Sequence, residues 1–170
     1  MRRQPAEEWA QSMLKVGDVA PAFRARATDG QVVALSNYAG RALIIYFFHK
    51  AFTPNCTIET KGFRDNYDEL AALGFEVIGI STDSEETQCR FAAHHGVTYP
   101  MVGDADKLIS RAYDVLWPLI PFSRRVAYVL DEHHRITAVF RHEFQANRHL
   151  DEILRFARKR AGEPSSVARP

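Results

Sequence analysis

Residues 42–57 read ALIIYFFHKAFTPNCT, and this stretch decides the fold. Residues 42–48 are all apolar or aromatic, which is typical of a central strand buried on both faces of a sheet. After a short loop, Thr53 and Pro54 predict a helix start, because threonine is a good N-cap and proline is favoured at the first helical position. The stretch therefore predicts a strand, a loop and a helix, with Cys56 in the first helical turn.

The residues that follow extend this unit to a strand, a helix and a second strand. Phe63, Tyr67 and Leu70 share one helical face with Ala71, and Gly74 is a typical helix stop. Residues 75–80 form a second apolar run, which predicts another buried strand. Strand, helix and strand in this order imply a right-handed crossover and parallel pairing of the two strands.

Further elements are expected on both sides of this unit. The patterns predict a hairpin of strands at 23–27 and 32–35, an extended piece at 99–102, and a second hairpin at 125–130 and 136–141. They also predict helices at 84–95, 107–113 and 149–159. This order of elements favours an α/β fold: a three-layer sandwich with a mixed central sheet and helices on both faces.

A chain of 170 residues that is 46% hydrophobic is long enough for one domain with a real core. We expect residues 1–14 to be an N-terminal extension with a short helix at 6–14, and residues 15–161 to be the domain. Residues 162–170 are small, polar and proline-bearing, which predicts a disordered tail.

The charge balance excludes several classes of partner. With 22 basic and 21 acidic residues, the net charge of +1 gives no reason to expect nucleic acid or an anionic membrane. No apolar run approaches the roughly 20 residues that span a bilayer. Glu7, Glu8 and Gln11 occupy the place of a signal peptide's apolar stretch. We therefore expect a soluble, cytoplasmic protein.

The two cysteines, Cys56 and Cys89, are too few for a disulfide scaffold and too far apart for a zinc site built on cysteine pairs. The histidine pairs at 94–95 and 133–134 also lack metal-binding spacing, so we expect no metal. Cys56 remains as either a reactive thiolate, favoured by the positive end of a helix, or a small buried hydrophobe.

Residues 46–57 resemble the active-site loop of peroxiredoxins. The likeness continues through residues 59–70, 77–84, 99–104 and 125–131, covers roughly 15–158 in matching order, and points to the bacterioferritin-comigratory (BCP/PrxQ) subfamily. The resemblance implies a thioredoxin-like fold. It also implies a thiol-dependent peroxidase without a cofactor, active on hydrogen peroxide and organic hydroperoxides.

The same resemblance assigns roles residue by residue. Cys56 matches the peroxidatic cysteine, whose thiolate attacks the peroxide and becomes a sulfenic acid. Thr53 matches the threonine that orients the peroxide, and Arg125 the arginine that stabilises the thiolate and the departing oxygen. Glu59 is expected to support the hydrogen bonding of the site. The alternative for Arg125 is a surface charge at a strand edge, with Arg124 as its rival on the opposite strand face.

Two positions depart from the family pattern. His49 stands where peroxiredoxins normally carry proline, and it either partners the thiolate or only fills the loop. Lys61 stands where many PrxQ proteins carry the resolving cysteine. Other members place that cysteine on the next helix, near Ala92. Cys89 lies one turn earlier on that helix. Cys89 is therefore either a resolving cysteine or a packing residue.

The implied partners are a hydroperoxide and a thiol reductant, either thioredoxin or glutaredoxin with glutathione. The chain itself is expected to be a monomer or a homodimer. A disulfide oxidoreductase is a weaker alternative, because Thr53 stands where that chemistry needs a second cysteine. A non-enzymatic module for redox sensing or chaperone activity is the other alternative, with His49 as the sign of decay.

Overall fold

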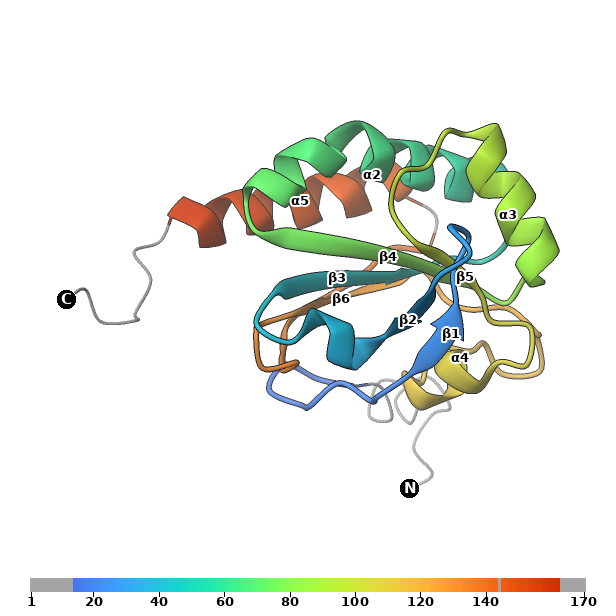
Figure 1. Cartoon of the computed structure of the whole chain (residues 1–170), viewed down its shortest axis with the longest axis horizontal. Helices are drawn as coiled ribbons and strands as arrows, with labels where there is room; N and C mark the ends of the chain where they lie inside the picture. The colour runs from blue at the N-terminus through green and yellow to red at the C-terminus, as the bar shows by residue number, and fades with distance from the viewer. Residues whose placement is uncertain (1–13, 144, 163–170) are drawn as a thin grey trace, which may run out of the picture.

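The computed structural model describes residues 14–143 and 145–162, which are built around a five-stranded mixed sheet (Figure 1). The sheet has the order β5–β4–β3–β6–β7. Its strands are β3 (Ala42–Phe47), β4 (Phe75–Ser81), β5 (Met101–Gly103), β6 (Val126–Leu130) and β7 (Ile136–Arg141). Strands β3, β4 and β5 run parallel, whereas β6 pairs antiparallel with both β3 and β7.

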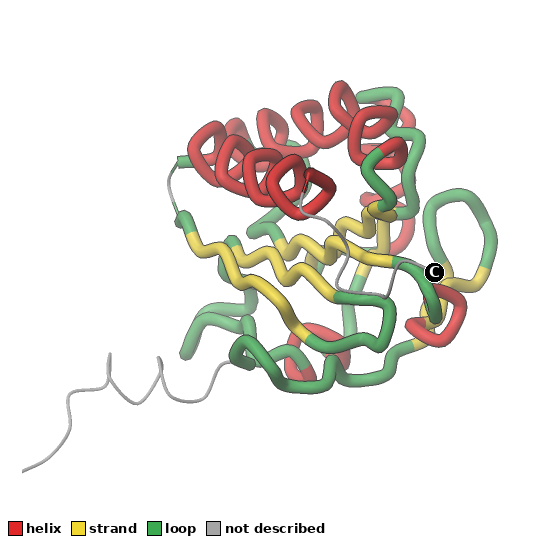
Figure 2. The backbone as a smooth tube through the Cα atoms, turned by 90° about the vertical axis from the view of Figure 1, so that its left-hand side faces the viewer, coloured by secondary structure: helices red, strands yellow, loops and turns green. Residues whose placement is uncertain are grey.

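Helices cover both faces of the sheet, as Figure 2 shows for the layer above it and the elements below. One face packs against α2 (Pro54–Ala72), α3 (Glu85–His94) and α5 (Ala146–Gly162). The other face is covered by α4 (Leu108–Ala112), the short 3-10 helix η1 (Leu35–Tyr38) and the hairpin of β1 (Arg24–Arg26) and β2 (Val32–Ala34). This is the expected three-layer thioredoxin-like α/β sandwich.

The central strand explains why the sequence from 42 to 48 has no polar interruption. Ile44 and Tyr46 alternate into the core below α2 and α5, while Leu43 and Ile45 face the other core. All four side chains are fully buried. Because successive residues of a strand point to opposite faces, a strand covered on both sides must be apolar throughout.

Most expected elements are confirmed, with shifts at their ends. Helix α2 ends at Ala72, and Gly74 takes a positive φ of 90°, as expected of a helix stop. The last helix is longer than expected and runs from Ala146 to Gly162. Gly162 is therefore its final residue rather than the first of a tail, because amphipathic spacing does not show how far a helix continues past its apolar face.

The expected N-terminal helix at 6–14 and the expected tail fall almost wholly outside the described residues. The division of the chain into an extension, a domain and a tail stays a prediction. Within residues 14–143 and 145–162, no helix combines the length and the apolar character needed to cross a bilayer.

Candidate active site

Cys56 is the third residue of α2, directly after the loop that leaves the central strand. Two hydrogen bonds tie the loop to β4 and to the residues just after it. The Phe48 amide donates to the Ile80 carbonyl at 3.0 Å, and the Ala51 amide donates to a carboxylate oxygen of Asp83 at 2.7 Å. These bonds fix the start of α2 at the carboxyl end of the parallel strands, where open α/β folds place their chemistry.

Phe52 closes this loop in a left-handed backbone conformation, with a φ of 65°. Such a φ is uncommon for a residue with a side chain and is held here by packing. Its half-exposed ring lies edge-on against Phe91 of α3, with ring centroids 5.1 Å apart. The aromatic contact therefore helps to set the direction in which the chain enters Thr53.

Thr53 occupies the N-cap position of α2, as expected, but its side chain does not cap the helix. Instead its hydroxyl donates to the Lys50 carbonyl at 2.7 Å. The hydroxyl thus turns back to the loop rather than toward the first helical turn. The first-turn N–H groups are thus not taken up by Thr53, and the positive end of α2 remains available to a negative charge at Cys56.

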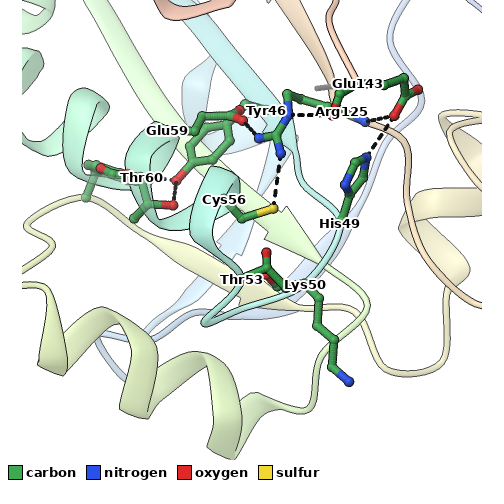
Figure 3. Close-up of polar contacts among 10 residues, drawn as sticks. Tyr46, His49, Lys50, Thr53, Cys56, Glu59, Thr60, Arg125 and Glu143 are labelled. Atoms are coloured by element: carbon green, nitrogen blue, oxygen red, sulfur yellow. Dashed lines mark hydrogen bonds and ion pairs between the residues drawn. The ribbon is translucent and has the colours of Figure 1, made fainter. Parts of the chain in front are cut away.

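Arg125 lies immediately before β6, is fully buried, and directs its guanidinium at Cys56 (Figure 3). Its Nη2 is 3.4 Å from the Cys56 sulfur, and its Nη1 donates to Glu59. Its Nε donates to the carbonyl of Glu143 at 3.4 Å. The alternative of a surface charge is therefore wrong for Arg125. Its rival Arg124 stacks over the Trp117 ring instead, with 4.6 Å from its guanidinium carbon to the ring centroid.

One guanidinium thus serves two acids, and all three side chains have no exposed surface. Burial raises the pKa of Glu59 to about 7, although the charge and hydrogen bond of Arg125 oppose that shift. Burial alone would lower the pKa of Arg125, but the charges of Glu59 and Cys56 outweigh it and raise the pKa. The site therefore holds a buried cation against a sulfur and a carboxyl group whose pKa is raised.

Cys56 itself is as buried as an inert core cysteine would be, and it touches the core below α2. Burial alone does not separate a packing role from a reactive one. The contact that bears on the choice is the Arg125 guanidinium, 3.4 Å from the sulfur, because a buried cation favours negative charge beside it.

His49 pairs with a carboxylate rather than with the Cys56 sulfur. Its Nε2 lies 2.8 Å from the Oε2 of Glu143, and both side chains are about one quarter exposed. The ring is directed at Glu143 rather than at the sulfur (Figure 3). The partner it does have, Glu143, also contacts Arg125 and was missed in the sequence.

A second group of buried polar side chains lies behind Glu59. The Tyr46 hydroxyl is 2.7 Å from that of Tyr99 and 3.2 Å from that of Thr60. Burial raises the pKa of both tyrosines, so their hydroxyls stay protonated. The Tyr46 ring fits because Gly79 has no side chain: a Cβ there would lie 2.6 Å from the ring. These residues were also missed, because each reads as an ordinary core position.

Cys89 lies on α3 and is only partly buried. It lines a pocket of about 230 Å³ together with Thr28, Asp29 and residues from the end of α3 and the loop after it. The loop before α2 instead meets α3 through Phe91, about 200° around the helix from Cys89. The two cysteines therefore do not face each other, and both thiols are free.

No group of three or more histidine, cysteine, aspartate or glutamate side chains in the described part of the chain is arranged to hold a metal ion. His94 and His95 take part in an aromatic cluster instead. Their rings lie 6.1 Å and 6.3 Å from the Phe52 ring.

Three comparisons relate this chain to known proteins. The sequence profile described as the AhpC/TSA family matches residues 16–139. The chain is 34% identical over 155 residues to peroxiredoxin Bcp of Escherichia coli K12, covering 87% of this chain and 98% of that protein.

Two solved structures share the fold over most of their length. Peroxidoxin BcpB from Mycobacterium tuberculosis has a TM-score of 0.79 at 29% identity, covering 86% of this chain and 97% of that one. A structure of the Xanthomonas campestris bacterioferritin comigratory protein, which concerns alkyl peroxide reduction, has a TM-score of 0.76 at 26% identity. It covers 82% of this chain and 92% of that one.

Proposed function

Because this chain belongs to the AhpC/TSA family, as a thiol-dependent peroxidase of the Bcp and peroxiredoxin Q group, we propose that Cys56 is its peroxidatic cysteine. The observation that carries the proposal is the buried guanidinium of Arg125, 3.4 Å from the sulfur at the start of a helix. In the same site, Thr53 orients the peroxide and Glu59 holds the other side of the guanidinium.

The proposed reaction is a displacement at oxygen. The Cys56 thiolate donates an electron pair to the terminal oxygen of the hydroperoxide, an S–O bond forms and the O–O bond breaks. The cysteine becomes a sulfenic acid, and the departing hydroxide or alkoxide takes up a proton to leave as water or an alcohol. Negative charge moves from sulfur to oxygen, so a fixed cation beside both atoms lowers the barrier.

The substrates proposed are hydrogen peroxide and organic hydroperoxides. The Xanthomonas relative is a protein whose alkyl peroxide reduction has been described, which supports the second class. Thr53 is partly exposed while Cys56 is buried, so the peroxide approaches from the Thr53 side of the first helical turn.

Stopped-flow mixing with hydrogen peroxide tests the assignment of Cys56. We expect the native protein and a Cys89→Ser variant to lose one thiol per equivalent of peroxide. The Cys56→Ser variant should lose no thiol on the same timescale. Serine is nearly isosteric, so the variant keeps the fold while losing the sulfur nucleophile. A native protein whose Cys56 thiol survives millimolar peroxide is no peroxidase of this kind.

Peroxiredoxins use thiol reductants, and here we propose that an external thiol, supplied by thioredoxin or by glutaredoxin with glutathione in the cytoplasm, reduces the Cys56 sulfenic acid. The geometry that supports this choice is the separation of Cys89 from the site. A bond between the two sulfurs would require α3 to unwind and turn its Cys89 face toward α2.

Peptide mapping after one equivalent of peroxide separates the two routes. We expect a sulfenic acid at Cys56, trapped by dimedone, with Cys89 still free. A Cys56–Cys89 crosslink within one chain would instead assign the resolving role to Cys89.

A further inference from the structure

The guanidinium of Arg125 has three sides, and each has its own acceptor. Two of the acceptors, Cys56 and Glu59, are side chains of α2. The third is the carbonyl oxygen of Glu143, which accepts from Nε at 3.4 Å. The direction in which the guanidinium points therefore depends on where the backbone at Glu143 lies.

Glu143 is in the connection between β7 and α5, outside any regular element. Its carboxylate has two contacts in the structure. Oε2 accepts from the backbone N–H of Arg125 at 3.4 Å and lies 2.8 Å from Nε2 of His49. Since the two contacts to Arg125 are long, the short bond to His49 is the one that holds the Glu143 side chain in place.

We propose that His49 and Glu143 are positioning residues, which act together through Arg125 to hold its guanidinium against the Cys56 sulfur. His49 joins the loop before α2 to the connection after β7 (Figure 3). The loop leads into the helix that carries Cys56, and the connection carries the carbonyl that accepts from Nε of Arg125, so the pair holds the two segments together. This inference rests on the proposed role of Cys56, and it gives His49 a function in the position that peroxiredoxins normally fill with proline.

The test uses the full chain in a Cys89→Ser background, so that only Cys56 reports. The variants are His49→Ala, Glu143→Ala, the two combined, and Glu143→Gln, which keeps an acceptor oxygen for both partners. Glu152→Ala is the matched control. The Glu152 carboxylate lies 2.6 Å from a histidine, His142, in the same kind of pair, but it does not contact Arg125.

We expect His49→Ala and Glu143→Ala each to lower the second-order rate of Cys56 with hydrogen peroxide by about tenfold, as for loss of one well-placed hydrogen bond. The double variant should fall no further than either single one, because both changes release the same guanidinium. Glu143→Gln should recover most of the rate. Glu152→Ala should keep the rate of the parent protein.

A rate for Glu143→Ala within about twofold of the parent would overturn the proposal, as would an equal loss in Glu152→Ala or effects that multiply in the double variant. The parent protein is measured in the same experiment. If its Cys56 does not react with peroxide at all, the proposed function fails, which is a different outcome from a parent that reacts and a Glu143 that does not matter.

Discussion

Replacing Arg125 with methionine is expected to slow the reaction of Cys56 with hydrogen peroxide by about 100-fold or more, as for removal of a fixed donor at a developing oxyanion. It should also destabilise the protein, because the buried carboxylate of Glu59 loses its cation. At a pH high enough for Glu59 to be charged, we expect a loss of about 3–5 kcal/mol. Stopped-flow kinetics and urea unfolding of the reduced protein measure the two effects separately.

The stability lost in Arg125→Met should depend on pH, and the ionisation of Glu59 decides whether it grows or shrinks as the pH rises. Burial already raises the pKa of Glu59 to about 7 in the presence of Arg125, and removing the cation raises it further. In the unfolded chain the same group ionises near its ordinary value of about 4.3. The folded variant therefore binds more protons than the unfolded one above that value, and its stability falls as pH rises.

A second substitution separates the two roles of the arginine. In Arg125→Met with Glu59→Met, both buried charges are gone, so we expect most of the lost stability to return and its new pH dependence to disappear. The peroxide rate should stay low, because the cation beside the sulfur is still missing. A double variant that regains the rate would mean that Arg125 acts only by compensating Glu59.

Much of the fold could be predicted because single segments carry it. The run at 42–48 and the start of α2 at Thr53 and Pro54 are local signals, and both are confirmed. The end of α5 could not be predicted. No local signal marks where that helix stops, because none of its residues after Ala157 is buried.

The site could be predicted in part. Cys56 was found from its place in the first helical turn, and Arg125 and Glu59 only from a resemblance. No sequence motif marks Glu143 as a site residue. Its place beside Arg125 is a consequence of the register of the β6–β7 hairpin. Val126 pairs with Arg141, so the next residues outward, Arg125 and His142, lie opposite each other.

That register could not be derived from the sequence alone. The pairing shifts by one residue between Val129 and Leu130, next to the turn at 131–134. A one-residue shift turns every side chain of a strand to the opposite face. Counting back from the turn would therefore have placed the residues after β7 on the wrong side of Arg125.

His149→Leu is expected to make the protein more resistant to acid. His149 is fully buried on α5, and neither ring nitrogen has a hydrogen-bond partner among the described residues. Its ring packs against that of His142, with 5.6 Å between the ring centroids. Burial, and then the positive charge of Arg125, lowers the pKa of His149 to about 3. The folded protein therefore holds this imidazole neutral where the unfolded chain protonates it.

The sign follows from proton binding. Between about pH 6.5, where a histidine in the unfolded chain ionises, and the folded value of about 3, the unfolded state binds the extra proton. The native protein thus loses stability as the pH falls through this window, by about 3 kcal/mol at pH 4 from His149 alone. Glu59, whose pKa is raised in the folded protein, contributes the opposite trend, with stability that rises as the pH falls. Because the native protein and His149→Leu share Glu59, its contribution cancels in the difference between their stabilities.

Urea unfolding of the native protein and His149→Leu from pH 7 to pH 4 measures that difference. At neutral pH we expect the variant to be more stable by about 1 kcal/mol, because two unpartnered nitrogens are replaced by an apolar side chain of similar size. The gap should widen steadily toward pH 4. His133→Gln, which removes an exposed histidine from the β6–β7 turn, is the control. Parallel curves for the native protein and His149→Leu would show that His149 accepts its proton without unfolding the chain.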